Sequence, residues 1–148
     1  LVPATPAQSI LNLFFASPTP DAGIEVQTES ELCLLHALWQ HATRRGAPPG
    51  LRERCRERCD RLIDTLQPDN ATNRPWAIHV FALAGAGFLG PPRSEADHYA
   101  QTLLHNCRVS LARPDTMSAQ ILADAAESLE HTYRTQHERE NPPETVPT

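Results

Sequence analysis

The segment between residues 51 and 66 constrains the fold most, because its apolar residues recur at the spacing of one helix face. They follow one another at steps of four, four, three, one and three residues, and they are Leu51, Cys55, Cys59, Leu62, Ile63 and Leu66. Charged residues fill most of the positions between them. The pattern predicts an amphipathic helix in which both cysteines face the core as small hydrophobic side chains.

The chain has four cysteines, Cys33, Cys55, Cys59 and Cys107. Residues four apart on a helix have Cβ atoms about 6 Å apart, whereas a disulfide needs about 3.5 to 4.5 Å, so Cys55 and Cys59 should not bond to each other. We expect reduced thiols. A zinc site would need Cys55, Cys59, His105 and Cys107 to converge, but no CxxC or HxxxH spacing supports one. No metal or other cofactor is therefore expected.

Helical signals dominate the rest of the sequence, and strand signals are nearly absent. Helices are predicted over residues 5–15, 28–45, 51–66, 75–89, 94–111 and from Asp115 onward. Thr28 and Glu31 have the spacing of a capping box, and Pro75 suits the first position of a helix. The helix over 75–89 is apolar nearly all round, which predicts a central helix; its His79 should be a core histidine hydrogen-bonded to a neighbour.

These elements predict an all-α fold of five to seven helices packed as antiparallel hairpins, either a helical bundle or a short repeat stack. We expect a single domain over residues 1–137, a flexible, proline-rich tail over 138–148, and an origin as a fragment of a larger protein. The turn GAPPG at 46–50 is echoed by GPP at 90–92, and LQPDN at 66–70 by ARPDT at 112–116. This echo suggests helical hairpins in tandem.

One segment resembles a known repeat family. Residues 81–104, FALAGAGFLGPPRSEADHYAQTLL, combine a small-residue helix, a glycine-containing turn, and Glu95, Ala96 and Tyr99 on a second helix. This arrangement is similar to a tetratricopeptide (TPR) repeat over about residues 73–116, with a longer period and with Leu103 at a position that is usually small. The resemblance implies a scaffold that binds peptides or proteins on a concave face.

Charge is unevenly distributed. The net charge of −5 argues against nucleic acid as a partner, yet seven of the thirteen arginines lie between Arg44 and Arg61. The arginine cluster from 44 to 58 is either a solvated face or a binding surface for an acidic or phosphorylated protein segment. On the second interpretation the binding residues are Arg45, Arg52, Arg56 and Trp39. The predicted function is a protein–protein interaction module of an effector or regulator, of unknown oligomeric state.

Two catalytic alternatives remain open. The chain has no lysine, which either reflects coding composition or protects a protein that works near ubiquitin ligases, so a ubiquitin ligase domain is one alternative. A cysteine hydrolase is the other, with Cys33 as nucleophile near a helix start and His36 or His98 as base. The longest apolar run, residues 76–89, is too short for a membrane span. We expect a cytoplasmic protein or one delivered into a host cytosol.

Overall fold

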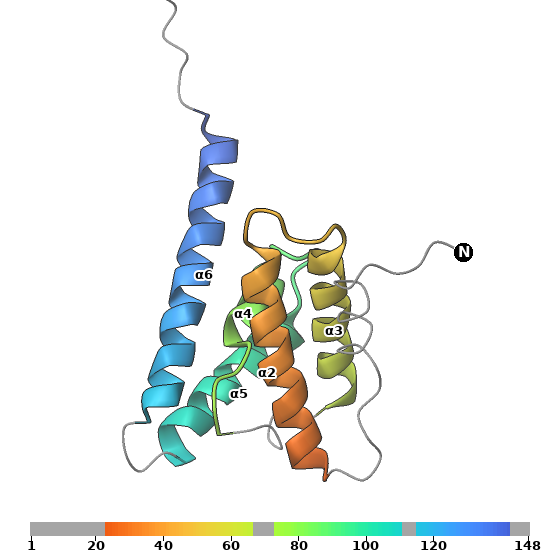
Figure 1. The fold of residues 1–148 in the computed structure, drawn as a ribbon, viewed down its shortest axis with the longest axis vertical. Helices are drawn as coiled ribbons and strands as arrows, with labels where there is room; N and C mark the ends of the chain where they lie inside the picture. Colours follow the sequence, from red (N-terminus) through yellow and green to blue (C-terminus); the bar gives the residue numbers. More distant parts are fainter. Residues whose placement is uncertain (1–22, 67–72, 111–114, 143–148) are drawn as a thin grey trace, which may run out of the picture.

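The computed structural model describes residues 23–66, 73–110 and 115–142. These ranges contain five α-helices and no strand, which confirms the predicted all-α class (Figure 1). The helix predicted over 5–15 lies outside the described residues. Among the helices that the structure describes, none has the length and hydrophobicity that crossing a bilayer requires.

The first two described helices, α2 (Ile24–Ala42) and α3 (Leu51–Thr65), form an antiparallel hairpin (Figure 1). Thr28 was predicted to cap α2, and this prediction was wrong: its hydroxyl donates to the Ile24 carbonyl at 2.7 Å from inside the helix. A capping motif favours a helix start but does not enforce one. Here the Gln27 amide already has the Gly23 carbonyl as its acceptor, at 3.0 Å.

Helix α4 (Ile78–Gly85) packs against all four other described helices, which confirms its predicted central position. It is shorter than the predicted range of 75–89. Ala77 precedes it in the left-handed region, with φ of +56°, so Pro75 lies outside the helix. A left-handed residue breaks the regular repeat of right-handed dihedral angles, and α4 therefore begins only after Ala77.

The end of α4 is also earlier than predicted. Gly87, at φ of +84°, donates to the Ala84 carbonyl at 3.2 Å, and the Phe88 amide donates to the Leu83 carbonyl at 2.9 Å. These two bonds form a Schellman motif, which satisfies the last carbonyls of a helix. The glycine stops α4 and turns residues 88–90 toward α3.

Helix α5 (Ser94–Ser110) follows as the antiparallel partner of α4, starting where the sequence predicted. A Cβ atom added at Gly85 would lie 3.0 Å from the backbone nitrogen of Asp97, so glycine permits the close approach of the two helices. Phe81 and Tyr99 stack across this contact with ring centroids 4.3 Å apart. The absence of a side chain at Gly85 therefore lets α4 and α5 pack closely at this position.

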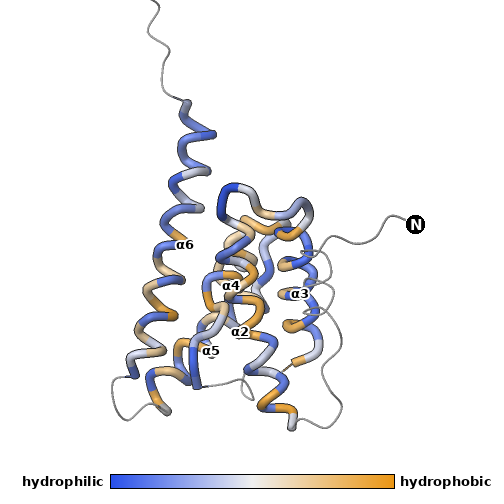
Figure 2. The backbone as a smooth tube through the Cα atoms, viewed as in Figure 1, coloured by the Kyte–Doolittle hydropathy of each residue, from blue (hydrophilic) through white to orange (hydrophobic). Residues whose placement is uncertain are grey.

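Helix α6 (Thr116–Glu140) begins after Asp115, next to the start that the sequence predicted. The Asp115 carboxylate accepts from the amides of Met117 and Ser118. It continues to Glu140 and so includes residues 138–140, which the sequence assigned to the tail. Its N-terminal part packs along the bundle, whereas its C-terminal part extends beyond the other helices and is mostly hydrophilic (Figures 1 and 2).

The core lies between the hairpins and contains the predicted cysteine stripe. Cys55 and Cys59 are fully buried, Cys107 is 8% exposed, and all four cysteines are free thiols. These cysteines fill space among leucine and aromatic side chains, as small hydrophobic residues do. The prediction that Cys55 and Cys59 face the core is confirmed.

Candidate functional site

The arginines of α3 divide into two groups. Arg52 and Arg56 are exposed, whereas Arg58 is buried and its Nη2 lies 2.7 Å from the Glu31 carboxylate of α2. The prediction that the whole cluster faces solvent was therefore wrong for Arg58. The sequence contained the signal, because Arg58 falls three residues after Cys55 and four before Leu62, on the buried stripe.

Three of the four predicted binding residues come together at one cavity. This cavity, of about 270 Å³, is lined by Trp39, Arg52, Glu53, Arg56, Phe88, Leu89, Gly90 and Thr132. The guanidinium carbon of Arg52 lies 5.5 Å from the centre of the Trp39 ring, within the range of a cation–π contact. Trp39 itself is fully buried and lies at the base of the cavity.

Two further cavities adjoin this central one. The cavity on the α6 side, about 510 Å³, shares Arg52, Phe88 and Thr132 with it and extends to Arg139. The cavity on the other side, about 330 Å³, shares Arg56, Leu89 and Gly90 and extends to Arg93. Because neighbouring cavities share lining residues, they form a row between α3, the α4–α5 connection and α6. We call it the α3–α6 groove.

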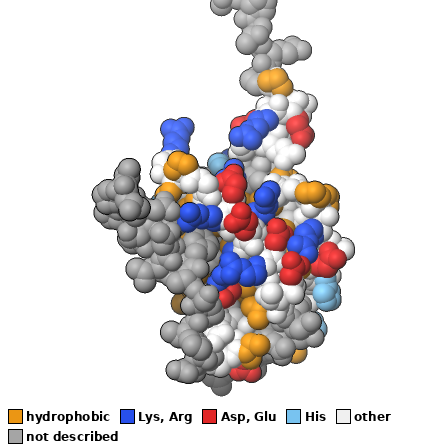
Figure 3. Space-filling view, turned by 90° about the vertical axis from the view of Figure 1, so that its right-hand side faces the viewer, with side chains coloured by type: hydrophobic (Ala, Val, Ile, Leu, Met, Phe, Trp, Pro, Cys, Tyr) orange, Lys and Arg blue, Asp and Glu red, His pale blue; other side chains and the backbone are white. Residues whose placement is uncertain are grey.

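The cations of the α3–α6 groove differ in their pairing. Arg93 lies 2.9 Å from both Asp60 and Asp64, and hydrogen bonds to Asp64 and Asp60 raise its pKa. Arg52 and Arg56 form no ion pair with any carboxylate in the described part of the chain. On the α3 side of the molecule, basic and acidic side chains are interspersed (Figure 3).

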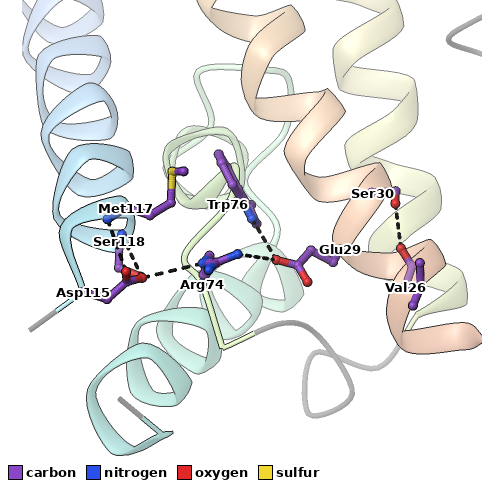
Figure 4. A network of polar contacts seen from close by, with 8 residues as sticks. All are labelled: Val26, Glu29, Ser30, Arg74, Trp76, Asp115, Met117 and Ser118. Atoms are coloured by element: carbon purple, nitrogen blue, oxygen red, sulfur yellow. Dashed lines mark hydrogen bonds and ion pairs between the residues drawn. The ribbon is translucent and has the colours of Figure 1, made fainter. Parts of the chain in front are cut away.

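Helix α6, which forms one wall of the groove, is held in place by polar contacts with α2. The Gln40 amide donates to the Asp124 carbonyl at 3.0 Å. Near the start of α6, Arg74 lies 3.4 Å from the Glu29 carboxylate and 3.6 Å from that of Asp115 (Figure 4). The Trp76 indole also donates to Glu29, at 3.3 Å. These contacts connect both helix starts and fix the orientation of α6.

Arg45, the fourth predicted binding residue, is exposed in the connection between α2 and α3. It lines none of the three cavities of the α3–α6 groove. The neighbouring Arg44 lines a different cavity, of about 560 Å³, between α2 and α6. The structure therefore separates Arg45 from Arg52 and Arg56, which the sequence had grouped together.

The arrangement of Cys33 and His98 differs from the one that a cysteine hydrolase requires. Cys33 lies in the middle of α2, since this helix begins at Ile24, and is thus remote from the helix N-terminus. Burial, and secondarily the charge of Glu29, raise the pKa of its thiol, which disfavours the reactive thiolate. His98 is exposed on α5, and the structure gives Cys33 no hydrogen bond to a histidine among the described residues.

His36 lines the α2–α6 cavity with one ring edge. Its Nδ1 accepts a hydrogen bond from the Ala77 amide at 3.3 Å, and its Nε2 lies 3.7 Å from the Asp124 carboxylate. The lone pair of the neutral ring is therefore engaged by the backbone, and burial lowers the pKa of His36 although Asp124 opposes the shift. Because the backbone occupies Nδ1 and Nε2 has no hydrogen-bond partner among the described residues, the ring is poorly placed to act as a general base.

His79 is fully buried, as predicted, but neither ring nitrogen has a hydrogen-bond partner in the described part of the chain. The predicted hydrogen bond to a neighbour was therefore wrong. The ring instead packs edge-on against His36, with centroids 4.8 Å apart. Burial, followed by the proximity of His36, lowers the pKa of His79 to about 3.

The residues considered for zinc do not form a site in the structure. Burial raises the pKa of the Cys55 thiol to about 12 and also raises that of Cys59, so both are neutral. His105 is exposed on α5 while Cys107 is buried on the same helix. Within the described ranges, no group of three or more histidine, cysteine or acidic side chains is placed to hold a metal ion.

Comparison with models of protein families, with curated proteins and with solved structures finds no match to this chain. The resemblance to TPR repeats therefore stays a prediction. A functional assignment depends on the geometry and charges of the α3–α6 groove.

Proposed function

We propose that this chain is a protein–protein interaction module that binds an acidic segment of a partner protein in the α3–α6 groove. One observation carries the proposal: Arg52 and Arg56, without ion pairs among the described residues, flank a cavity with an apolar floor. The two residues occupy successive turns of one face of α3, with a rise of about 6 Å between them. Both guanidinium groups thus lie beside the same short stretch of the groove.

The chemistry of the groove favours carboxylates as ligands. A guanidinium group offers a planar set of donors that matches a carboxylate in a bidentate geometry. The Arg52 side chain is also supported from below by the Trp39 ring, which limits the conformational freedom that binding would otherwise remove. Because the groove is open to solvent, salt should screen the attraction and weaken binding.

A display library of random twelve-residue peptides, selected on the intact protein, tests this function and does not require the partner to be identified first. We expect enriched peptides to be rich in aspartate and glutamate. Their affinity, measured by fluorescence polarisation, should fall at least tenfold for the double variant Arg52→Glu/Arg56→Glu. The matched control is Arg45→Glu/Arg108→Glu, which makes the same change in net charge at exposed positions outside the groove.

The two double variants separate a site from a general charge effect. Equal losses for both variants would show that only net charge matters, and the groove would not be the binding site. Enrichment of basic or uncharged peptides, or full affinity for the Arg52/Arg56 variant, would also contradict the proposal. Circular dichroism of all variants excludes unfolding as the cause, since every substituted side chain is exposed.

A further inference from the structure

We infer that the α3–α6 groove selects acidic segments that carry one large apolar side chain between their acidic residues. This inference rests on the proposed function and specifies its ligand. The partner segment would insert the apolar side chain into the central cavity and present carboxylates to Arg52 on one side and Arg56 on the other. A purely acidic segment would leave the central cavity empty.

Two large apolar side chains of the groove, Phe88 and Leu89, meet only at its central cavity. The floor of the central cavity is made by Trp39, Phe88 and Leu89, and the last two are only half-buried in the free protein. The cavity next to it on the α6 side is lined mainly by polar groups, which include Thr43, His131 and Gln136. The cavity on the Arg93 side has only the smaller apolar side chains Ala84 and Pro91 beside Leu89, so the central cavity suits a large apolar ligand side chain best.

The central cavity is also preorganised. The Phe88 ring packs edge-on against Tyr133 with centroids 4.4 Å apart, and the Schellman motif fixes the Phe88 backbone. On the opposite side, Arg52 covers the Trp39 ring. Rigid walls reduce the entropy lost on binding, so that burial of one side chain contributes to affinity.

The arginines determine what flanks the apolar residue. Arg52 lines both the central cavity and the one on the α6 side, while Arg56 lines the central cavity and the one on the Arg93 side. The two guanidinium groups thus stand at the two boundaries of the central cavity. A peptide that crosses the central cavity therefore passes Arg52 at one boundary and Arg56 at the other. Carboxylates are therefore expected on both sides of the apolar residue.

The experiment compares paired peptides against a protein whose central cavity is filled. From the selected sequences, one peptide is made with its large apolar residue and one with serine in its place. We expect the apolar peptide to bind roughly ten- to a hundredfold more tightly, the range for burial of one aliphatic or aromatic side chain. Thr132→Trp, which projects an indole from α6 into the cavity, should remove this difference.

Thr102→Trp is the matched control, because Thr102 is also a half-buried helical threonine whose hydroxyl bonds the carbonyl four residues back, and it lies on α5 outside the groove. The difference between the two peptides should persist in this variant. Equal affinity of both peptides for the wild type, or a difference that survives Thr132→Trp, would overturn the inference. Acidic peptides that still require Arg52 and Arg56 would then leave the proposed function standing.

Discussion

The indole N–H of Trp39 donates a hydrogen bond of 3.1 Å to the hydroxyl of Ser128, and both groups are buried. This contact joins the last turn of α2 to the middle of α6 and fixes the floor of the α3–α6 groove to its wall. A buried donor that loses its acceptor retains the cost of desolvation without compensation. The pair therefore affects stability directly and ligand binding indirectly.

Replacement of Ser128 by alanine should reduce the free energy of unfolding by about 1 to 3 kcal/mol, because the Trp39 indole is left unpaired. Urea denaturation followed by tryptophan fluorescence measures the change. Ser30→Ala provides the control, since Ser30 is exposed on α2 and bonds only the Val26 carbonyl of its own helix. A loss for Ser128→Ala no larger than that for Ser30→Ala would contradict this account.

The buried pair of Arg58 and Glu31 should be sensitive to removal of one partner. Glu31→Gln leaves the Arg58 guanidinium in the interior without a neutralising charge, and we expect a loss of about 3 to 5 kcal/mol. The double variant Glu31→Leu/Arg58→Met should recover most of this loss, because both charges are absent. Thermal and urea unfolding measure both effects.

An exposed pair serves as the reference for that experiment. Asp64 is 62% exposed in its ion pair with Arg93, so Asp64→Asn should cost less than about 1 kcal/mol. If Glu31→Gln is as mild as Asp64→Asn, Arg58 has found another partner or water, and the buried pair is not important for stability.

Protonation of His79 should destabilise the fold in mild acid. Its pKa is lowered to about 3 in the folded protein, against about 6.5 in an unfolded chain. Protons therefore bind the unfolded chain first, and the stability present above pH 6.5 is lost as the pH falls toward 3. The loss is about 1.4 kcal/mol per pH unit, or about 2 kcal/mol between pH 6.5 and pH 5.

The variant His79→Phe isolates this contribution, because it removes the titrating group and keeps an aromatic ring in the core. Its stability between pH 7 and pH 5 should change less than that of the wild type by about 2 kcal/mol. His98→Gln, at an exposed position, should leave the wild-type pH dependence intact. An identical pH slope in His79→Phe and wild type would mean that His79 does not titrate as described.

Thiol labelling should distinguish Cys33 from the other cysteines. Cys33 is half-buried, whereas Cys55, Cys59 and Cys107 are buried. We expect Ellman's reagent to modify a single thiol in the native protein and four thiols in guanidinium chloride, with slow native labelling because the pKa of Cys33 is raised. Cys33→Ser should abolish the native reaction. Comparable rates at two or more thiols would refute the buried positions.

Local periodicity was sufficient to predict most helices and their buried faces. The stripe from Leu51 to Leu66 predicted which side of α3 packs inward, and Asp115 predicted the start of α6. These features depend on residues within one or two helical turns, so the sequence contains the information in a short window. The ends of α4 were harder to predict, because the left-handed conformation of Ala77 has no clear local signal.

The groove could be predicted only in part. Arg52 and Arg56 share a face of α3, and this face follows from their spacing of four residues. That Trp39 from α2, Phe88 from the α4–α5 connection and Thr132 from α6 meet these arginines depends on contacts between segments distant in the sequence. The same dependence explains why Arg45 was expected beside the other arginines.

The sequence by itself determined that this chain forms amphipathic helices and that Cys55, Cys59 and Cys107 serve as core residues, because helical periodicity and the burial of apolar side chains are local consequences of residue order. Only the tertiary structure decided which charged residues stay exposed and which are buried, and where a cavity opens between α3 and α6. Those outcomes depend on how helices pack against one another, and packing is settled by the shapes of all the contacting side chains together.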